Sequence, residues 1–215
     1  SLRGQGDQAA LATLYREALS RDPSLHRYRV LLARALEEGG DHGAALDALD
    51  AVPPGLLDEA RLERIRRRVE ESARLARDFP DGLPLRARGD HFVVELGTPA
   101  GGSLSLLLDT GATLTVLKPA VVGRLDGARP AGRTIRLGTA AGIVTAPLYR
   151  VASLMLGPLR VEDVDVAVMA LDGLEGVDGL LGMDQLGRFD FHIDPQAGRL
   201  RLAHRRDPEA QRGDG

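Results

Sequence analysis

The chain contains no cysteine and no tryptophan, and aromatic residues make up only 3% of its 215 positions. The absence of cysteine excludes disulfides, thiolate catalysis and cysteine-based zinc sites. Because aromatics are so scarce, leucine, valine and alanine must supply most of the core. No apolar run approaches the ~18 residues that a membrane-spanning helix needs.

The chain also has no large excess of positive or negative residues, since the formal net charge is −3. Neither a basic surface nor a nucleic-acid-binding motif is evident, so we expect no nucleic-acid partner. The five histidines have no metal-ligand spacing, and the acidic residues of 172–178 lack the regular spacing of a calcium loop. We therefore expect no metal and no cofactor.

Residues 1–79 are predicted to form an all-α domain, because apolar residues recur there at spacings of three and four. The predicted helices begin after Asp7, after Asp22-Pro23-Ser24, at Asp41 and near Leu56. Residues 31–49 resemble the helix-turn-helix of a tetratricopeptide repeat, with Gly39-Gly40 as the turn. A small helical bundle fits these residues equally well. In either form the helices are a candidate docking site for a protein partner.

Residues 80–205 are predicted to be all-β, because turn residues recur there every eight to twelve positions. Residues 206–215 form a polar tail. The predicted strands are His91–Leu96, Leu104–Leu108, Thr115–Leu117, Thr134–Leu137, Ile143–Leu148, Ala152–Leu156, Leu159–Val161, Val164–Val168, Phe189–Ile193 and Arg199–Leu202.

Two motifs in this half indicate chemistry. In the first, three leucines precede Asp109-Thr110-Gly111-Ala112-Thr113. A buried strand that delivers a carboxylate into a glycine-containing turn presents an aspartate for acid–base chemistry. The second motif, Gly179-Leu180-Leu181-Gly182-Met183-Asp184, follows about seventy residues later.

Together these motifs resemble those of the bacterial retropepsin-like aspartic proteases. Two further blocks support the resemblance, residues 137–146 where the family has a flap hairpin and Leu156-Gly157-Pro158-Leu159 as a hairpin between two late strands. The resemblance spans roughly residues 83–204 and implies a closed β-barrel. The fold class is then α+β by segregated domains, with the helical region first. The chain has only one Asp-Thr-Gly, so each subunit of a homodimer would supply half an active site.

The resemblance also implies roles for individual residues. Asp109 is the expected catalytic residue, and its loop is supported by Thr110, Gly111, Ala112 and Thr113. The expected flap, which would contact substrate, comprises Gly138, Thr139, Ala140, Ala141, Gly142 and Ile143. The residues expected to support the loop from behind are Leu180, Leu181, Gly182 and Asp184.

The function predicted from these residues is aspartic endopeptidase activity on peptides or proteins, in a homodimer formed through the Asp-Thr-Gly loops. An alternative is a weakly catalytic peptide-binding or scaffolding module, because the flap tip has no aromatic residue and the helices look like a docking domain. A third reading is a monomer whose site is completed by a different subunit.

The location is expected to be periplasmic, or membrane-anchored and facing the periplasm. The sequence starts at Ser1 without methionine, which fits the removal of a signal or anchor, although no signal peptide is recognisable in it. High arginine, alanine and glycine against little lysine suggests a GC-rich bacterial genome.

Overall fold

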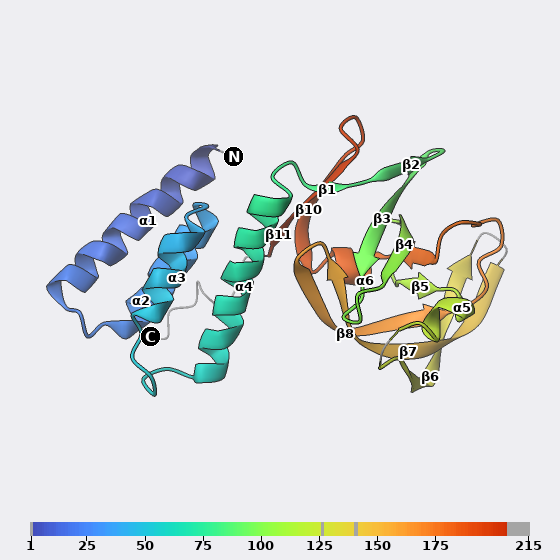
Figure 1. Ribbon diagram of the computed structural model, residues 1–215, viewed down its shortest axis with the longest axis horizontal. Helices are drawn as coiled ribbons and strands as arrows, with labels where there is room; N and C mark the ends of the chain where they lie inside the picture. The colour runs from blue at the N-terminus through green and yellow to red at the C-terminus, as the bar shows by residue number, and fades with distance from the viewer. Residues whose placement is uncertain (1, 126, 140–141, 206–215) are drawn as a thin grey trace. The chain divides into compact units, whose positions relative to one another are not determined.

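The computed structural model describes residues 2–125, 127–139 and 142–205 of the chain (Figure 1). It divides into two compact units, Ser1–Pro80 and Asp81–Gly215. The first unit contains helices and the second is rich in strands, which is the order that the sequence predicted. The tail at 206–215 lies outside the described residues.

Four helices make up the described part of the first unit. They are α1 (Leu2–Arg21), α2 (His26–Glu38), α3 (His42–Asp50) and α4 (Glu59–Asp78). The side chain of Asp41 accepts a hydrogen bond of 3.1 Å from the Ala44 amide, so it caps α3 as predicted. The predicted helix start at Asp7 is wrong, because α1 runs through this residue. An exposed aspartate costs a helix only a few tenths of a kcal/mol, roughly, so it does not force a start.

Small residues let these helices pack closely. Ala33 and Ala45 are completely buried in their core, together with Val69 of α4. The buried Glu37 accepts hydrogen bonds from Arg68 Nε at 3.1 Å and from Ser72 Oγ at 3.0 Å, so a buried charge ties α2 to α4. The similarity to a tetratricopeptide repeat stays a prediction. Among the described residues, no helix has the length and apolar character needed to cross a membrane.

The second unit contains most of the strands predicted from the sequence, and several are longer than predicted. Its elements are β1 (Leu83–Pro84), β2 (Arg86–Arg88), β3 (His91–Gly97), β4 (Ser103–Leu108), β5 (Val116–Leu117), α5 (Pro119–Val122), β6 (Arg129–Thr139), β7 (Gly142–Leu156), β8 (Leu159–Val168), β9 (Gly179–Leu181), α6 (Met183–Leu186), β10 (Phe189–Asp194) and β11 (Arg199–His204).

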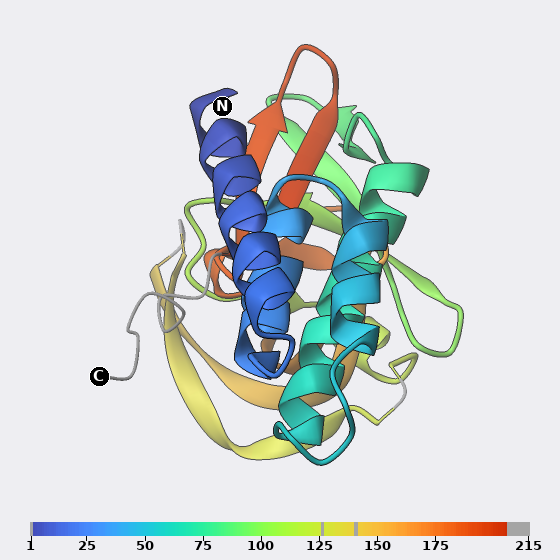
Figure 2. The same ribbon diagram turned by 90° about the vertical axis from the view of Figure 1, so that its left-hand side faces the viewer.

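These strands form two sheets. The larger has the order β2-β3-β4-β9-β5-β8-β7-β6, and the smaller has the order β1-β11-β10. One further pairing, between Gly97 of β3 and Met155 of β7, brings the larger sheet back onto itself. Figure 2 shows the strong curvature of β6 and β7 that accompanies this arrangement. The closed barrel itself stays a prediction.

Strand β9 determines the geometry of the site. It pairs in parallel with β4, with Leu108 opposite Leu181, and antiparallel with β5, with Val116 opposite Leu180. The chain therefore leaves β4, passes the end of β9 and enters β5 on its other side. The segment that makes this crossing is residues 109–115, which we call the Asp109 loop.

Two predicted breaks in the strands are wrong. β7 is continuous through residues 149–151, and β8 is continuous through Glu162 and Asp163, whose φ of 52° had no signal in the sequence. Pairing with neighbouring strands over their full length outweighs the local turn preference of these residues. The hairpin at Gly157-Pro158 is found where it was predicted, with Leu156 paired to Leu159 and Gly157 at a φ of 61°.

Candidate active site

Asp109 follows directly on a strand whose last three residues are buried. Leu106, Leu107 and Leu108 are at most 7% exposed, whereas Asp109 is half-buried and Thr110 is exposed. The three leucines predict this arrangement, since a run of apolar residues fits a strand covered on both faces. The carboxyl group therefore lies at the border between the core and the surface.

The Asp109 loop holds its own carboxyl group in place. Oδ1 accepts hydrogen bonds from the Gly111 amide at 2.9 Å and the Ala112 amide at 3.1 Å. A Cβ at Gly111 would lie 3.3 Å from the same oxygen, so the absence of a side chain there leaves room for the carboxylate. Among the described residues no donor reaches Oδ2, which leaves this oxygen available to water, a substrate or a second carboxyl group.

The loop is attached to the chain segment that follows β9. The Asp109 amide donates to the Leu181 carbonyl at 3.1 Å, and the Met183 amide donates to the Ala112 carbonyl at 2.8 Å. These two bonds connect residues about seventy positions apart. The structure thus brings together Asp109 and the supporting segment that the sequence singled out.

Two glycines allow this close approach. A Cβ at Gly182 would lie 2.5 Å from the Leu114 carbonyl carbon and 2.9 Å from the Thr115 amide nitrogen. A Cβ at Gly179 would lie 2.1 Å from the Val116 carbonyl oxygen. Since these neighbours are backbone atoms, no larger residue fits without displacing the Asp109 loop or β5. The glycines of the second motif thus have a steric role.

Asp184 joins α6 to the end of the Asp109 loop. Its Oδ1 accepts from the Thr115 amide at 2.9 Å, from Thr115 Oγ1 at 2.8 Å and from the Gln185 amide at 3.0 Å. Its Oδ2 accepts from Gln185 Nε2 at 2.9 Å. Asp184 was expected to support the loop from behind, and in the structure it bonds Thr115, the last residue of the loop, 69 positions away in the sequence.

Thr115 is a residue of the site that the sequence reading missed. It is completely buried, and its hydroxyl both donates to Asp184 and accepts from the Gly182 amide at 3.1 Å. Thr113, which was expected to support the loop, is exposed, and within the described chain its hydroxyl has no hydrogen-bond partner. Nothing in the local sequence distinguishes the two threonines.

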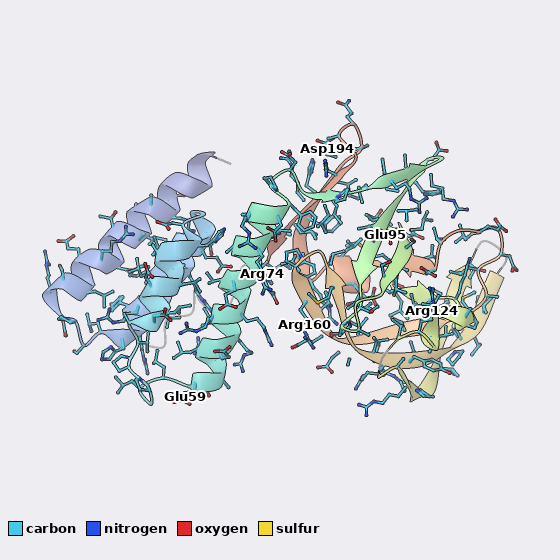
Figure 3. All side chains as sticks on the ribbon, viewed as in Figure 1. Glu59, Arg74, Glu95, Arg124, Arg160 and Asp194 are labelled. Atoms are coloured by element: carbon cyan, nitrogen blue, oxygen red, sulfur yellow. The ribbon has the colours of Figure 1, made fainter. Side chains whose placement is uncertain are left out.

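The acidic segment before β9 is also bound to the sheet. Asp178 Oδ2 accepts from the Ser105 amide at 2.9 Å, and Oδ1 pairs with Arg124, which Figure 3 labels. The Lys118 amide donates to the Asp178 carbonyl at 2.9 Å. These contacts fix the start of β9. No group of three or more potential metal ligands occurs in the described ranges.

The predicted flap lies at the end of the hairpin formed by β6 and β7. The last described pairs are Gly138 with Ile143 and Thr139 with Gly142, and Thr139 Oγ1 donates to the Gly142 carbonyl at 2.8 Å. Ile143 is 66% exposed. Ala140 and Ala141, also predicted for the flap, lie outside the described residues.

The flap hairpin reaches the site through an apolar cluster. Ile135 and Leu137 of β6 pack against the same buried cluster as Leu114 of the Asp109 loop and Leu180 of β9. The three segments singled out from the sequence therefore meet around one apolar patch. The arrangement combines the Asp109 carboxyl group with an apolar cluster beside its loop and a two-stranded hairpin that packs on this cluster.

Comparison with known proteins is consistent with this geometry. Residues 97–185 match the family model described as "Aspartyl protease". The resemblance to the aspartyl proteases is thereby confirmed for this segment. It contains both motifs and the flap hairpin, and it excludes the helical unit.

Among solved structures, the crystal structure of a retropepsin-like aspartic protease from Rickettsia conorii is similar to this chain. The sequence identity is 24% and the TM-score is 0.40, over 56% of this chain and 84% of that chain. No curated protein matches the chain.

Proposed function

We propose that this aspartyl protease segment is the catalytic part of a retropepsin-like endopeptidase that hydrolyses peptide bonds as a homodimer. The observation that carries the proposal is the Asp109 carboxyl group, which ends a buried strand and is anchored through Oδ1 while Oδ2 has no donor among the described residues. The match of residues 97–185 to the aspartyl proteases supports it.

Peptide hydrolysis requires a base that takes a proton from water and an acid that protonates the carbonyl oxygen. Two carboxyl groups a few ångströms apart share one proton, because ionising both is costly. The ionised member activates the water, whose oxygen attacks the carbonyl carbon, while the protonated member gives its proton to the carbonyl oxygen. When the carbon–nitrogen bond then breaks, the nitrogen leaves with a proton from the pair.

One Asp109 cannot fill both roles, and the chain has one Asp-Thr-Gly. A two-fold axis at the Asp109 loop would bring identical carboxyl groups face to face. Thr110 fits a position at this axis, because it is exposed and its hydroxyl has no hydrogen-bond partner in the described chain. In this dimer Gly111 and Ala112 orient the carboxyl group, and the ring of strands completed by Gly97 and Met155 forms the barrel.

The flap hairpin would close over the bound peptide and exclude water from the reacting atoms. Gly138, Thr139, Gly142 and Ile143 belong to its described end, and the 66% exposure of Ile143 gives the peptide an apolar contact. The substrate is thus an extended peptide segment lying between the flap hairpin and the Asp109 loops.

In the alternative function, the protein is a peptide-binding module that forms the same dimer and uses the same flap but hydrolyses peptides only weakly. The helical unit, as a site for a protein partner, favours this alternative, and so does a flap whose described end has no aromatic side chain. The periplasmic location stays a prediction.

The deciding experiment compares Asp109→Asn with Asp163→Asn. Both changes replace one carboxyl group by an amide, and asparagine tolerates the positive φ of Asp163, which lies on β8 outside the site. Cleavage of fluorescently labelled, denatured casein is followed from pH 3 to 8, with the mass in solution measured by light scattering.

We expect a dimer near twice 23.0 kDa, a bell-shaped dependence of cleavage on pH, and loss of at least about a thousandfold in rate for Asp109→Asn. Asp163→Asn should cleave like the wild type. A dimer that binds casein but cleaves nothing at any pH would support the binding module. Equal cleavage by Asp109→Asn and wild type would reject the proposed reaction.

A further inference from the structure

We propose that Thr115 is a positioning residue for Asp109, and that Asp184 holds it in place from the far side. The inference rests on the proposed function. Thr115 contacts neither the carboxyl group of Asp109 nor the surface, since it is completely buried and ends the Asp109 loop. Its effect must therefore pass through the backbone of the loop.

The Asp109 loop has two fixed ends. At the first end the Asp109 amide donates to the Leu181 carbonyl at 3.1 Å, and in the middle the Met183 amide donates to the Ala112 carbonyl at 2.8 Å. At the second end Thr115 makes two bonds to Asp184 and one to the Gly182 amide, and the Ala167 amide donates to its carbonyl at 3.0 Å.

A hydroxyl group is required at this position. Thr115 Oγ1 donates to the Asp184 carboxylate and accepts from the Gly182 amide, and valine of the same shape can do neither. Loss of the hydroxyl would leave the Gly182 amide buried without a partner and remove one donor from a carboxylate. The loop would then have to shift, because Gly182 already lies in contact with Leu114 and Thr115.

The shift would be passed on to the catalytic carboxyl group. Only two residues, Thr113 and Leu114, separate Thr115 from Ala112, whose amide together with that of Gly111 orients Asp109 Oδ1. Catalysis by paired carboxyl groups depends on their positions to within a fraction of an ångström, and a displacement of about 1 Å can cost on the order of a hundredfold in rate. Thr115 therefore affects the rate of the proposed reaction through the position of the Asp109 carboxyl group.

Asp184 should tolerate asparagine but not alanine. As a carboxylate it accepts four hydrogen bonds, two of them from Thr115 and two from Gln185. In the described structure the buried Gln185 Oε1 has no hydrogen-bond partner. If the new side chain of Asp184→Asn turned its amide nitrogen toward Gln185, a flip of the Gln185 amide would place Oε1 to accept from it, and the three bonds to Oδ1 would remain. Alanine removes every one of these acceptors.

The matched control is Thr98, another threonine that bonds a glycine amide. Its Oγ1 accepts from the Gly102 amide at 3.0 Å and the residue is 8% exposed. It lies at the turn that starts β4, whereas Asp109 follows the end of that strand. Thr98→Val thus removes a similar hydrogen bond a full strand length from Asp109.

The test measures kcat and KM for the best-cleaved peptide of a synthetic library, at a temperature at which every variant is folded and dimeric. We expect Thr115→Val and Asp184→Ala to lower kcat by roughly tenfold to a hundredfold, with KM changed by less than about threefold. Thr115→Ser, Asp184→Asn and Thr98→Val should stay within about threefold of the wild type. A Thr115→Val enzyme as fast as the wild type, or Thr98→Val as slow as Thr115→Val, would overturn the proposal.

A second readout separates this proposal from the proposed reaction. The amide resonances of Gly111 and Ala112 in ¹⁵N NMR spectra report the position of the Asp109 loop without any substrate. They should move in Thr115→Val, return in Thr115→Ser and stay in place in Thr98→Val. If the wild type cleaves no peptide, the proposed reaction fails, and the role of Thr115 is judged on these resonances alone. Unchanged resonances in Thr115→Val would reject it.

Discussion

The Asp109 loop and the flap hairpin are held in opposite ways. The loop is bonded to segments about seventy residues away, through Leu181, Gly182 and Asp184. In the outer part of the hairpin, residues 134–139 pair only with residues 142–147 within the described chain, because the pairing of β7 with β8 ends at Leu148 and Ala167. The molecule thus combines a carboxyl group fixed by long-range hydrogen bonds with a hairpin that is hydrogen-bonded to the sheet only at its base and otherwise packs on an apolar cluster.

This difference suits the proposed reaction. A carboxyl group must be placed accurately before the substrate arrives, whereas a cover must open to admit it. Long-range hydrogen bonds in the core provide the first property, and a two-stranded ribbon beyond the edge of a sheet provides the second. Substitutions in the two regions should therefore affect different measurable quantities.

The largest effect is expected at Gly182. Gly182→Ala would place a Cβ 2.5 Å from a backbone carbon of Leu114, so either β9 or the Asp109 loop must move. We expect a loss of about 3 kcal/mol or more in the free energy of unfolding, together with loss of cleavage. Urea denaturation and casein cleavage measure the two. Gly138→Ala in the hairpin is the control, since its Cβ would meet nothing within 4 Å. Equal stability of the two variants would contradict the steric role of Gly182.

A smaller, pH-dependent effect is expected at the base of the hairpin. Asp165 of β8 accepts hydrogen bonds from Arg150 Nε at 2.8 Å and from Arg133 Nη2 at 2.6 Å, so it joins β8 to both strands of the hairpin. The irregular pairing between Pro130 and Thr134 occurs beside Arg133. The Arg150 guanidinium first, and Arg133 second, lower the pKa of Asp165.

Because this pKa is lowered on folding, the ionised carboxylate stabilises the folded protein above the unfolded value of about 3.9. That stabilisation disappears as the pH falls through the lower, folded value. Asp165→Asn should therefore lower Tm by about 2–4 °C at pH 7 and by progressively less below about pH 4. Thermal unfolding at a series of pH values measures this difference. A Tm difference that stays the same down to about pH 2 would show that charge is not its cause.

The smallest effect on stability is expected at Ile143. Since this side chain is 66% exposed at the end of the hairpin, Ile143→Thr should change the free energy of unfolding by less than about 0.5 kcal/mol. If the flap contacts substrate, KM should rise by roughly threefold to tenfold with little change in kcat. Peptide kinetics and urea denaturation test both parts. A fall in kcat with unchanged KM would place Ile143 among the residues that organise the reaction.

The same two regions differ in how far the sequence predicts them. Asp109, Gly111 and Gly182 were found because a carboxylate in a glycine turn and a glycine after two leucines are local patterns. Thr115 was missed because its role depends on Asp184, 69 positions away, and no local pattern encodes that contact. The strands of the hairpin were predicted too short, with a break at residues 149–151, where the pairing of β7 with its neighbouring strands keeps the strand continuous.

The position of β9 also determines when, during synthesis of the chain, the Asp109 loop can become ordered. Asp109 leaves the ribosome 72 residues before Leu181, the residue to which its own amide bonds (181 − 109). At roughly 5–20 residues per second, the aspartate is exposed for about 4 to 14 seconds before the strand that organises it has been made. A nascent or truncated chain that ends before Gly179 therefore has Asp109 but lacks the strand to which the Asp109 loop is bonded. For the proposed protease, this order of synthesis would prevent cleavage of neighbouring proteins until nearly the whole β-rich unit has been made.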